Sequence, residues 1–376
     1  MSGKKRIVFL TGTRADYSKI HPIICGLDKH QEFETHIFAT GMHLLEKHGE
    51  TIREVLLDHE RIFMFNNQSV PFRMDISLAN TIKGFSDYLC EITPDMIVVH
   101  GDRIEPMAGA IVGSTNNILT CHVEGGEVSG TVDEIIRHAI SKLSHIHLVA
   151  NDEASSRLVR MGEIEKSIYV VGSPDIDLML SDNLPELNEV LAHYEIPFKD
   201  YAIAICHPVT TELDSVNKLA KNFVDALLES NLNYVVVHPN NDPGSDSIRD
   251  ELKRLNAYNK RIAQYPSIRF SRFLTLLKNC NFVIGNSSLG IREAPVYGIP
   301  AINIGSRQNM RSQGRKIFNV EPEKVEILSA IKDARSHPRS KESVCYEFGD
   351  GKSVSRILDI FLDSAIWNTP KQKAFS

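Results

Sequence analysis

Short runs of β-branched and aliphatic residues alternate along the chain with longer segments in which apolar residues recur every three or four positions. The first pattern is typical of buried strands and the second of amphipathic helices. Strands that alternate with helices form βαβ units, because two parallel strands need a long crossover between them. The alternation therefore predicts an α/β fold built on parallel sheets.

The alternation falls into two series, separated by a polar, leucine-containing segment at residues 173–200 that is typical of a connection between domains. A length of 376 residues also suits two domains. The expected strands are residues 6–13, 34–41, 95–102, 118–126, 146–151 and 168–175 in the first series, and 201–208, 233–241 and 281–288 in the second. We predict two Rossmann-like domains, over residues 1–175 and 176–353, with a final helical segment, 354–376, packing back on the first.

The composition limits the classes of function and the compartment. A formal net charge of -6 disfavours general nucleic-acid binding, which selects concentrated lysine and arginine. The six cysteines stand singly with no CxxC spacing, which is typical of reduced thiols. No stretch approaches the roughly 18 apolar residues of a membrane helix, and the first lysines lead into a strand rather than a secretion signal. We expect a cytoplasmic protein that binds neither nucleic acid nor membrane.

Polar loops at the carboxyl ends of the expected strands are the candidate ligand sites, because open parallel sheets bind ligands there. The first strand ends in "GTRADYSK", where a glycine allows a tight turn and a helix opens. Arg14 and Ser18 can donate hydrogen bonds to an anion at this helix N-terminus. A plain strand-to-helix turn with a surface arginine is the alternative, since this loop is not a GxGxxG fingerprint.

The stretch "VIGNSSLGIREAPVYGIPAINIG" in the second series is more specific. Its strand ends at Asn286, Ser287 and Ser288. Gly290 then lets a helix begin, so that free backbone N–H groups and two hydroxyls can cradle a diphosphate. Gly298 is typical of the end of that helix.

Further polar residues of the second series suit a nucleotide. Glu293, expected near the start of the helix, is either a surface carboxylate that the helix dipole favours or an acceptor for the two hydroxyls of a ribose. Arg307 suits an anionic ligand. His207 and Asn240 follow other strands, His207 as a phosphate donor or acid/base group and Asn240 as a ligand contact.

Three carboxylates are expected at the ligand face of the first domain. Glu124 ends a strand just before two glycines, Asp102 ends the preceding strand, and Asp133 lies in the first turn of the next helix. Like charges so close raise the proton affinity of at least one carboxyl group, which makes an acid and a base available together. A single carboxylate at a strand end is more often a structural cap, but three that face an anion site favour catalysis.

Other residues of the same stretch have structural interpretations. Thr131 and Glu134 have the spacing of a capping box. Arg137, four residues after Asp133, shares its helix face and can hold that carboxylate in place. The one HxH pair, His145 and His147, alternates with Ile146 in a probable strand, and the sequence has no HExxH motif, so we predict no metal site. It also lacks the GxSxG and GxxxxGK[ST] motifs of hydrolases and nucleotide triphosphatases.

Taken together, these loops resemble those of the hydrolysing UDP-N-acetylglucosamine 2-epimerases of the bacterial sialic-acid pathway. The resemblance runs from about residue 5 to about residue 367, in "GTRADYSKIHPII", "HGDRIEPMAGAIVGS", "CHVEGGEVSGTVDEIIRHAISKLSHIHLVAN", "CHPVTTE", "HPNND" and "GNSSLGIREAPVYGIPAINIGSRQ". The related non-hydrolysing 2-epimerases typically show a GTRPE-like opening and a GDT-like strand end, where this chain has "GTRADYSK" and "GDRIEP". This departure favours the hydrolysing branch.

The resemblance implies a GT-B fold with the active site in the cleft between the domains, no cofactor, and a homodimer or homotetramer. The implied reaction converts UDP-N-acetylglucosamine and water to N-acetylmannosamine and UDP through 2-acetamidoglucal. Asp102, Glu124 and Asp133 are then catalytic, with Asp102 or Glu124 moving the proton at C2 and Asp133 orienting water or the glucal. Contacts to the UDP-sugar are expected from Arg14, Ser18, Arg103, Arg137, His207, Asn240, Ile268, Ser287, Ser288, Glu293 and Arg307.

Two other functions stay open. Close relatives in legionaminic acid synthesis act on UDP-2,4-diacetamido-2,4,6-trideoxyglucose, and the residues of the sugar pocket are too dispersed in the sequence to decide between the two sugars. A GT-B glycosyltransferase would share the diphosphate and ribose contacts but would need an acceptor. Release of UDP from the UDP-sugar without an acceptor would therefore favour the epimerase over the glycosyltransferase. A UDP-sugar-binding protein without turnover is disfavoured by the three carboxylates.

Overall fold

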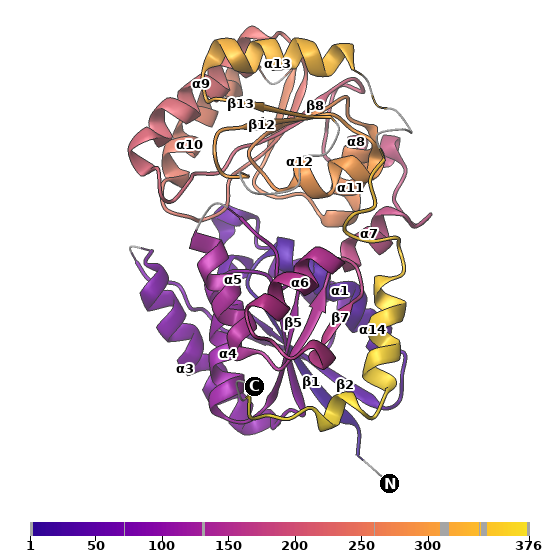
Figure 1. The fold of residues 1–376 in the computed structure, drawn as a ribbon. Coiled ribbons are helices and arrows are strands. Elements are labelled where there is room, and N and C mark those ends of the chain that lie inside the picture. The colour runs from indigo at the N-terminus through magenta and orange to yellow at the C-terminus, as the bar shows by residue number, and fades with distance from the viewer. Residues whose placement is uncertain are drawn as a thin grey trace. The chain divides into compact units, whose positions relative to one another are not determined.

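The computed structural model describes residues 3–70, 72–129, 132–258, 260–308, 316–337, 339 and 344–373. The chain forms two compact units (Figure 1). Unit 1 comprises Met1–Glu127, Asp133–Ser181 and Glu347–Ser376, and unit 2 comprises Val128–Val132 and Asp182–Tyr346. Each unit has a parallel sheet of its own, so the predicted α/β fold with two parallel-sheet domains is confirmed.

Unit 1 contains a seven-stranded sheet with the order β3-β2-β1-β4-β5-β6-β7. Every neighbouring pair of strands is parallel. The turns that follow β1, β4 and β5 therefore lie next to one another at the carboxyl ends of the strands. The strands are β1 (Lys5–Thr11), β2 (Phe33–Ala39), β3 (Ile62–Met64), β4 (Met96–His100), β5 (Leu119–Val123), β6 (Ile146–Val149) and β7 (Ile168–Val170).

Helices connect these strands, and one helix from the end of the chain joins them. The α-helices are α1 (Arg14–Leu27), α2 (Ile52–Asp58), α3 (Met74–Ile92), α4 (Ile104–Thr115), α5 (Val132–Leu143), α6 (Asp152–Arg160), α7 (Pro174–Met179) and α14 (Ser353–Leu362). Short 3-10 helices are η1 (Gly41–Leu44), η2 (Glu46–His48), η3 (Glu165–Ser167) and η8 (Ile366–Asn368). Helix α14 packs on α1 and α7 (Figure 1). The contact is close, because a Cβ on Gly26 of α1 would lie 3.1 Å from the side chains of Val354 and Leu358.

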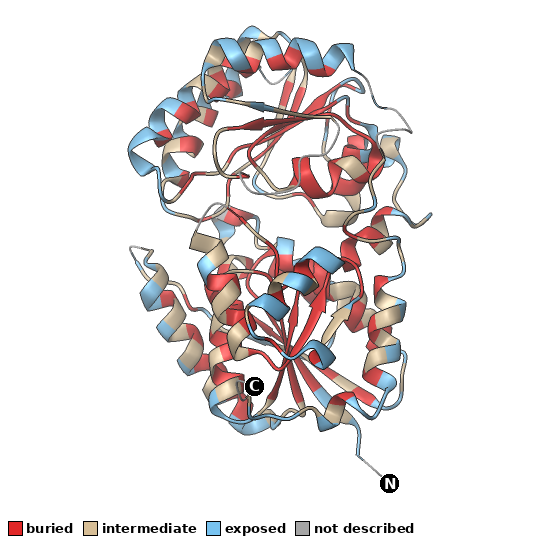
Figure 2. Ribbon diagram, in the orientation of Figure 1, coloured by how far each residue is buried: buried red, intermediate tan, exposed pale blue. Residues whose placement is uncertain are grey.

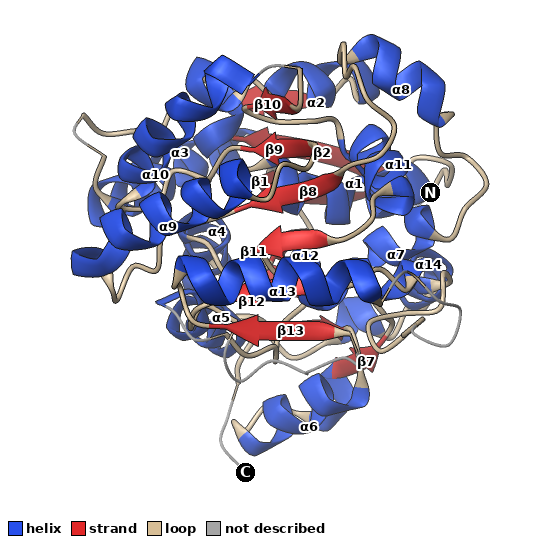
Figure 3. Cartoon of the chain, turned by 90° about the horizontal axis from the view of Figure 1, so that it is seen from above, coloured by secondary structure: helices blue, strands red, loops and turns tan. Residues whose placement is uncertain are grey.

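Unit 2 contains a six-stranded parallel sheet with the order β10-β9-β8-β11-β12-β13, which Figure 3 shows in that sequence. The strands are β8 (Ala202–Ile205), β9 (Tyr234–Val237), β10 (Ile262–Tyr265), β11 (Val283–Gly285), β12 (Ala301–Ile304) and β13 (Ile317–Val320). The helices are α8 (Leu187–His193), η4 (Leu213–Ser215), α9 (Val216–Glu229), α10 (Ser245–Leu252), η5 (Lys253–Tyr258), α11 (Phe270–Asn279), α12 (Leu289–Arg292), η6 (Ala294–Tyr297) and α13 (Lys324–Ser336).

The central strands β5, β8 and β9 are buried along their whole length, and β4 is buried except for its last residue, His100 (Figure 2). This is the pattern of a parallel sheet covered by helices on both faces. Phe9 and Val98 are among the fully buried core residues of unit 1, as are Phe223 and Tyr234 in unit 2. Burial of one such side chain contributes about 1.5–3 kcal/mol. The strands are thus held firmly, and they position the turns at their carboxyl ends.

All the predicted strands are present, but β3, β10, β12 and β13 were not predicted. Three of these, β3, β10 and β13, are edge strands. They have only three or four residues and are partly exposed, so their apolar pattern is weak. The segment predicted as a connection carries α7 and α8. None of the helices described here is long and apolar enough to cross a membrane.

Candidate functional site

The turn between β1 and α1 is fixed by a buried carboxylate. Thr13 is the N-cap of α1 and forms a capping box with Asp16. The Asp16 carboxylate also accepts hydrogen bonds from the N–H of Gly12, at 2.9 Å, and from the hydroxyl of Thr11. Burial raises the pKa of Asp16 above its ordinary value. These bonds hold the first turn of α1 in one conformation.

Predicted ligand residues follow the neighbouring strands β1 and β4. Arg14 is the first residue of α1, and Ser18, one turn on, is buried and donates to the carbonyl of Ala15 at 2.8 Å. Arg103 is the N-cap of α4, and its Nε lies 3.7 Å from Oε2 of the fully buried Glu105. The two arginines therefore stand at adjacent helix starts, where backbone N–H groups also favour anions.

Glu124 follows β5 with a strained backbone. Its φ is 62°, a left-handed value that few residues other than glycine adopt. Its N–H donates to the carbonyl of Leu148 at 2.8 Å, which ties the turn to β6. A Cβ on Gly126 would lie 2.3 Å from the carbonyl oxygen of Ala154, and a Cβ on Gly125 would lie 2.9 Å from two neighbouring side chains. The Gly-Gly pair is therefore required by close packing around this carboxylate.

The Glu124 carboxylate lies among polar and charged partners. Lys19 Nζ is 3.3 Å from Glu124 Oε1, and His100 Nε2 is 3.2 Å from Oε2. The hydroxyl of Ser173 also donates to Oε1. Lys19 Nζ is at the same time 2.5 Å from Asp175 Oδ2. The ammonium group thus compensates two buried carboxylates, each of which would be costly alone.

Asp102 is paired with Arg137. The guanidinium of Arg137 donates to Asp102 Oδ2 through Nη2 and to the carbonyl of Glu127, at 3.2 Å, through Nη1. The Arg137 side chain is 5% exposed and that of Asp102 is 26% exposed. This pair joins α5 to the turn after β4, a link that the sequence did not predict, because Arg137 was expected to hold Asp133.

Asp133 lies in the first turn of α5 and is half-buried. Glu134, beside it, has Oε1 3.5 Å from His138 Nε2, one turn further along the helix. The capping box predicted for Thr131 and Glu134 falls outside the described residues, since Thr131 is not among them.

In unit 2 one buried amide joins the turns after β8, β11 and β12. Asn286 Oδ1 accepts from the N–H of His207 at 2.7 Å, and Asn286 Nδ2 donates to the His207 carbonyl at 2.8 Å. The carbonyl of Asn286 accepts from Arg307 Nη1 at 3.3 Å and from Gln308 Nε2 at 2.8 Å. His207 and Arg307, both predicted ligand contacts, are therefore held through the same residue.

Two further predicted residues lie at other turns of unit 2. The N–H of Asn240, after β9, is 3.4 Å from His207 Nδ1, and its side-chain amide donates to Asp242 at 2.5 Å. This contact brings Asn240 and His207 together at the ends of two neighbouring strands. Ile268, between β10 and α11, is fully buried.

The helix predicted after Ser288 is shorter than expected. Ser288 is the N-cap of α12, and Ser287 Oγ accepts from the first N–H of that helix at 3.3 Å. The α-helix ends after one turn, since Pro295 has no N–H to continue it, and η6 follows up to the left-handed Gly298. Glu293 is consequently the buried C-cap of α12 and at the same time the N-cap of the 3-10 helix η6.

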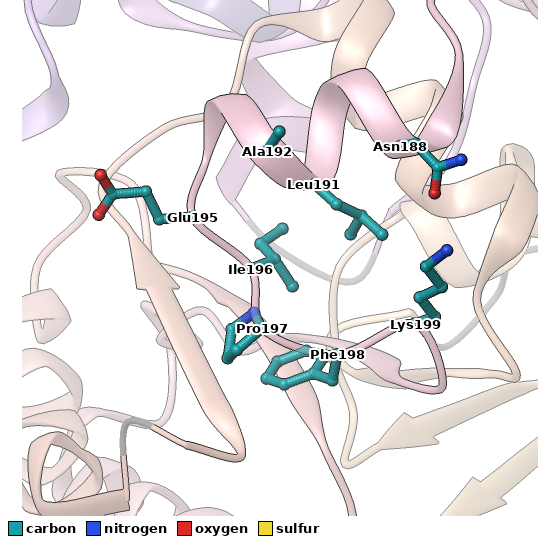
Figure 4. A pocket seen from close by; sticks show the side chains of 8 residues that line it. All are labelled: Asn188, Leu191, Ala192, Glu195, Ile196, Pro197, Phe198 and Lys199. Carbon is teal, nitrogen blue, oxygen red and sulfur yellow. The ribbon is translucent and has the colours of Figure 1, made fainter.

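A hollow of about 420 Å³ lies elsewhere in unit 2 (Figure 4). It is lined by α8 and the segment before β8: Asn188, Leu191, Ala192, Glu195, Ile196, Pro197, Phe198 and Lys199. These residues precede β8, whereas His207 follows its carboxyl end. The hollow contains none of the predicted site residues and is not the candidate site.

Comparison with known proteins assigns the chain to a family. The family described as UDP-N-acetylglucosamine 2-epimerase matches residues 26–362. The chain belongs to this family. A UDP-N-acetylglucosamine 2-epimerase of Neisseria meningitidis serogroup B is 44% identical over 373 residues, 99% of this chain and 98% of the relative. A UDP-N,N'-diacetylbacillosamine 2-epimerase (hydrolyzing) of Legionella pneumophila is 35% identical, over 95% of each chain.

Solved structures of 2-epimerases share the fold. A Methanocaldococcus jannaschii UDP-GlcNAc 2-epimerase in complex with UDP-GlcNAc and UDP has a TM-score of 0.80 at 25% identity, covering 95% of this chain and 99% of that one. A Neisseria meningitidis UDP-GlcNAc 2-epimerase has a TM-score of 0.77 at 18% identity, with the same coverage. The GT-B-like architecture expected from the family resemblance is thereby confirmed.

Sequence reasoning missed three of the Glu124 partners in this 2-epimerase. Lys19 directly follows Ser18 in the loop "GTRADYSK", and His100 begins "HGDRIEP", so both lay within motifs already singled out. Ser173 lies in a segment interpreted as a connection between domains. Its contact with Glu124 spans 49 positions, and no local pattern marks it.

Proposed function

We propose that this 2-epimerase is a hydrolysing enzyme that converts UDP-N-acetylglucosamine and water to N-acetylmannosamine and UDP. The observation that carries the proposal is the pair of carboxylates at the ends of the neighbouring strands β4 and β5, with Asp102 paired to Arg137 and Glu124 to Lys19. The loop "GDRIEP" and the Legionella relative named as hydrolyzing support the hydrolysing branch.

The reaction needs two proton transfers at C2 of the sugar. A base removes the C2 proton while the C1–O bond breaks, so that UDP leaves with the bonding electrons and a C1=C2 double bond forms. Water then adds its oxygen at C1 and loses a proton, and C2 receives a proton on the opposite face. Two carboxyl groups from two strands suit these steps, and no redox cofactor is needed.

We assign removal of the C2 proton to Asp102. Its side chain is 26% exposed, and Arg137 contacts only Oδ2 in the recorded hydrogen bond, which leaves Oδ1 able to take a proton from substrate. Glu124 is 7% exposed, and both of its oxygens are already hydrogen-bonded. We therefore assign the return of a proton to C2 to Glu124 together with His100, 3.2 Å away, and orientation of the water to Asp133.

The nucleotide is assigned mainly to unit 2. His207, Arg307 and the hydroxyls of Ser287 and Ser288 suit the diphosphate, because each can donate a hydrogen bond to a phosphate oxygen. Glu293 suits the ribose hydroxyls, and Asn240 and the backbone at Ile268 suit the uridine. Arg14, Ser18 and Arg103 of unit 1 are further candidates for the leaving phosphate. We place the product at the start of sialic-acid synthesis, which a relative, the Escherichia coli polysialic acid biosynthesis protein P7, 30% identical, supports.

The test is incubation with UDP-N-acetylglucosamine alone in D2O, followed by NMR of the released sugar. We expect UDP and free N-acetylmannosamine with deuterium at C2. UDP-N-acetylmannosamine formed without release of UDP would instead make the enzyme non-hydrolysing. A parallel reaction with UDP-2,4-diacetamido-2,4,6-trideoxyglucose compares the two candidate substrates. If the enzyme releases UDP faster from this sugar nucleotide than from UDP-N-acetylglucosamine, the proposed substrate is wrong.

A test of the assignments follows from the order of steps. Asp102→Asn should release UDP and sugar much more slowly and together, because elimination is the impaired step. Glu124→Gln should release UDP with 2-acetamidoglucal, because elimination proceeds but C2 is not reprotonated. If Asp102→Asn releases glucal, the two roles are reversed.

A further inference from the structure

Two histidines and a cysteine meet on the outer side of α1 in unit 1. His21 and Cys25 are four residues apart on α1 and so share one helix face, and His59 is the C-cap of α2. Nδ1 of His21 lies 3.1 Å from Nε2 of His59, and Cys25 Sγ lies 3.6 Å from each ring nitrogen of His21. One ligand atom from each residue lies within 4.8 Å of the other two.

These separations are the edge lengths of a tetrahedral site. With Zn–N bonds of about 2.05 Å and a Zn–S bond of about 2.3 Å, tetrahedral angles place two nitrogens about 3.3 Å apart and a nitrogen and a sulfur about 3.6 Å apart. The recorded N···N and N···S distances, 3.1 Å and 3.6 Å, are within about 0.2 Å of these values. A metal ion on His21 Nδ1 would fit after the Cys25 side chain moves outward, because Sγ now lies 3.6 Å from both ring nitrogens.

The outer nitrogen of each imidazole faces a carboxylate. His59 Nδ1 is 3.7 Å from Asp28 Oδ2, and His21 Nε2 is 4.0 Å from Asp58 Oδ2. These carboxylates lie beyond hydrogen-bond distance but favour an N–H or a positive charge on the outer side of each ring, and the Tyr17 hydroxyl lies 3.1 Å from His21 Nδ1 on the inner side. The two inner nitrogens are 3.1 Å apart and share a hydrogen bond, whose proton a metal ion would replace.

We propose that His21, Cys25 and His59 form a binding site for a zinc-class divalent metal ion, with the fourth position open to water. The mixed nitrogen and thiolate ligands suit Zn²⁺ rather than Mg²⁺ or Ca²⁺, which prefer oxygen. The three residues are half-buried, and the His21 side chain is 30% exposed, which gives an ion a path of entry. The ion would fasten α1 to the end of α2, a structural role that does not depend on the proposed reaction.

The sequence predicted no metal site because these ligands do not form a motif of residues close together in the chain. His59 is 38 positions from His21, and only the packing of α2 beside α1 brings it near. The i, i+4 spacing of His21 and Cys25 was the available signal.

The test uses the full chain without an affinity tag, freed of metal by a chelator. Zn²⁺ alone is titrated by calorimetry, and Co²⁺ alone is added as a spectroscopic probe. We expect one equivalent of Zn²⁺ to bind and raise the thermal midpoint, and Co²⁺ to give the thiolate charge-transfer band and the intense visible bands of a tetrahedral Co–S site. Cys25→Ser and His59→Gln should each weaken Zn²⁺ binding at least about tenfold.

The matched control is Cys90→Ser, which removes an exposed thiol on α3. It should leave Zn²⁺ affinity and the Co²⁺ spectrum unchanged. The proposal is overturned if the unmodified chain binds no stoichiometric Zn²⁺, or if Co²⁺ binds without a thiolate band. It is also overturned if Cys25→Ser, which replaces the thiol by a group of similar size, binds Zn²⁺ as the unmodified chain does.

Discussion

The turn after β5 in unit 1 places a buried carboxylate among charged partners, whereas the turn after β11 in unit 2 places a buried neutral amide between backbone groups. Glu124 is contacted by Lys19 and His100, and its backbone is strained. Asn286 is satisfied by the backbone of His207 and by Arg307. Both turns follow central strands of parallel sheets, so the difference lies in the side chains and not in the fold.

This difference indicates that the two turns have different functions. Buried charges held in pairs are costly to fold and are suited to moving protons. A neutral amide that fixes loops leaves cationic side chains nearby to bind an anion. We therefore expect changes in unit 1 to act on the chemical step and on stability, and changes in unit 2 to act on nucleotide affinity.

The largest effect is expected at Asp102. Asp102→Asn should lower kcat for UDP release by about 10²–10⁴, the usual contribution of a general base, with little change in KM. Steady-state kinetics on UDP-N-acetylglucosamine measure it. The control is Glu134→Gln, which removes a half-exposed carboxylate on α5 near Asp133. An equal loss of kcat in the two variants would contradict the assignment of Asp102 as the general base.

An effect of similar size, on stability, is expected at Lys19. Lys19→Met leaves Glu124 and Asp175 buried without their shared cation, so the free energy of unfolding should fall by about 3–5 kcal/mol. Urea denaturation followed by the fluorescence of Trp367, the single tryptophan, reports on unit 1. The control Lys83→Met breaks an exposed pair with Asp87 and should cost less than about 1 kcal/mol. A Lys19 variant as stable as the Lys83 variant would contradict the pairing.

In unit 2 a smaller effect is expected on nucleotide affinity. Arg307→Ala should raise the Kd for UDP about 10- to 100-fold, since one charged hydrogen bond contributes about 1.5–3 kcal/mol. Calorimetric titration with UDP measures it. Arg335→Ala, on α13, is the control and should bind UDP normally. An unchanged Kd in Arg307→Ala would remove this residue from the nucleotide site.

The smallest effect is an acid sensitivity of unit 1. Burial lowers the pKa of His43 and of His122 to about 3. In the unfolded chain these imidazoles take up protons below about pH 6.5, while in the folded chain they stay neutral until about pH 3. The stability is therefore complete above about pH 6.5 and falls as the pH drops towards 3, by about 1.4 kcal/mol per pH unit for each histidine.

Urea denaturation at pH 7.5 and at pH 5.5, again followed by Trp367, checks this slope. His43→Asn should reduce the change in the free energy of unfolding with pH by the contribution of one histidine. If the free energy of unfolding of the variant depends on pH as strongly as that of the unmodified chain, His43 does not contribute to the acid sensitivity.

The sequence predicted the central part of the fold well and the edges poorly. Strands such as β4 and β9 contain continuous buried apolar residues, which local pattern identifies. β12 directly follows Pro300 and lies close to the turn motif around Asn286, and the edge strands that were missed are short and partly exposed. The single-turn α12 was taken for a longer helix because the effect of Pro295 on its hydrogen bonding was not considered.

At the candidate site the sequence predicted residues in the turns that follow the strands but did not predict which of these residues pair. Arg137 and Asp102 are 35 positions apart, and Lys19 and Asp175 are 156 apart. Such pairs depend on strand order, because β1, β4 and β5 are neighbours only in the folded sheet. The positive φ of Glu124 likewise cannot be inferred from its residue type, since glutamate rarely adopts it.

The central claim is that unit 1 carries the chemistry and unit 2 the nucleotide. Titration of UDP into Asp102→Asn and Arg307→Ala, side by side, tests it most directly. We predict that Asp102→Asn binds UDP within about twofold of the unmodified chain while being inactive, and that Arg307→Ala binds at least about tenfold more weakly. Loss of UDP affinity in Asp102→Asn as large as that in Arg307→Ala would contradict the account.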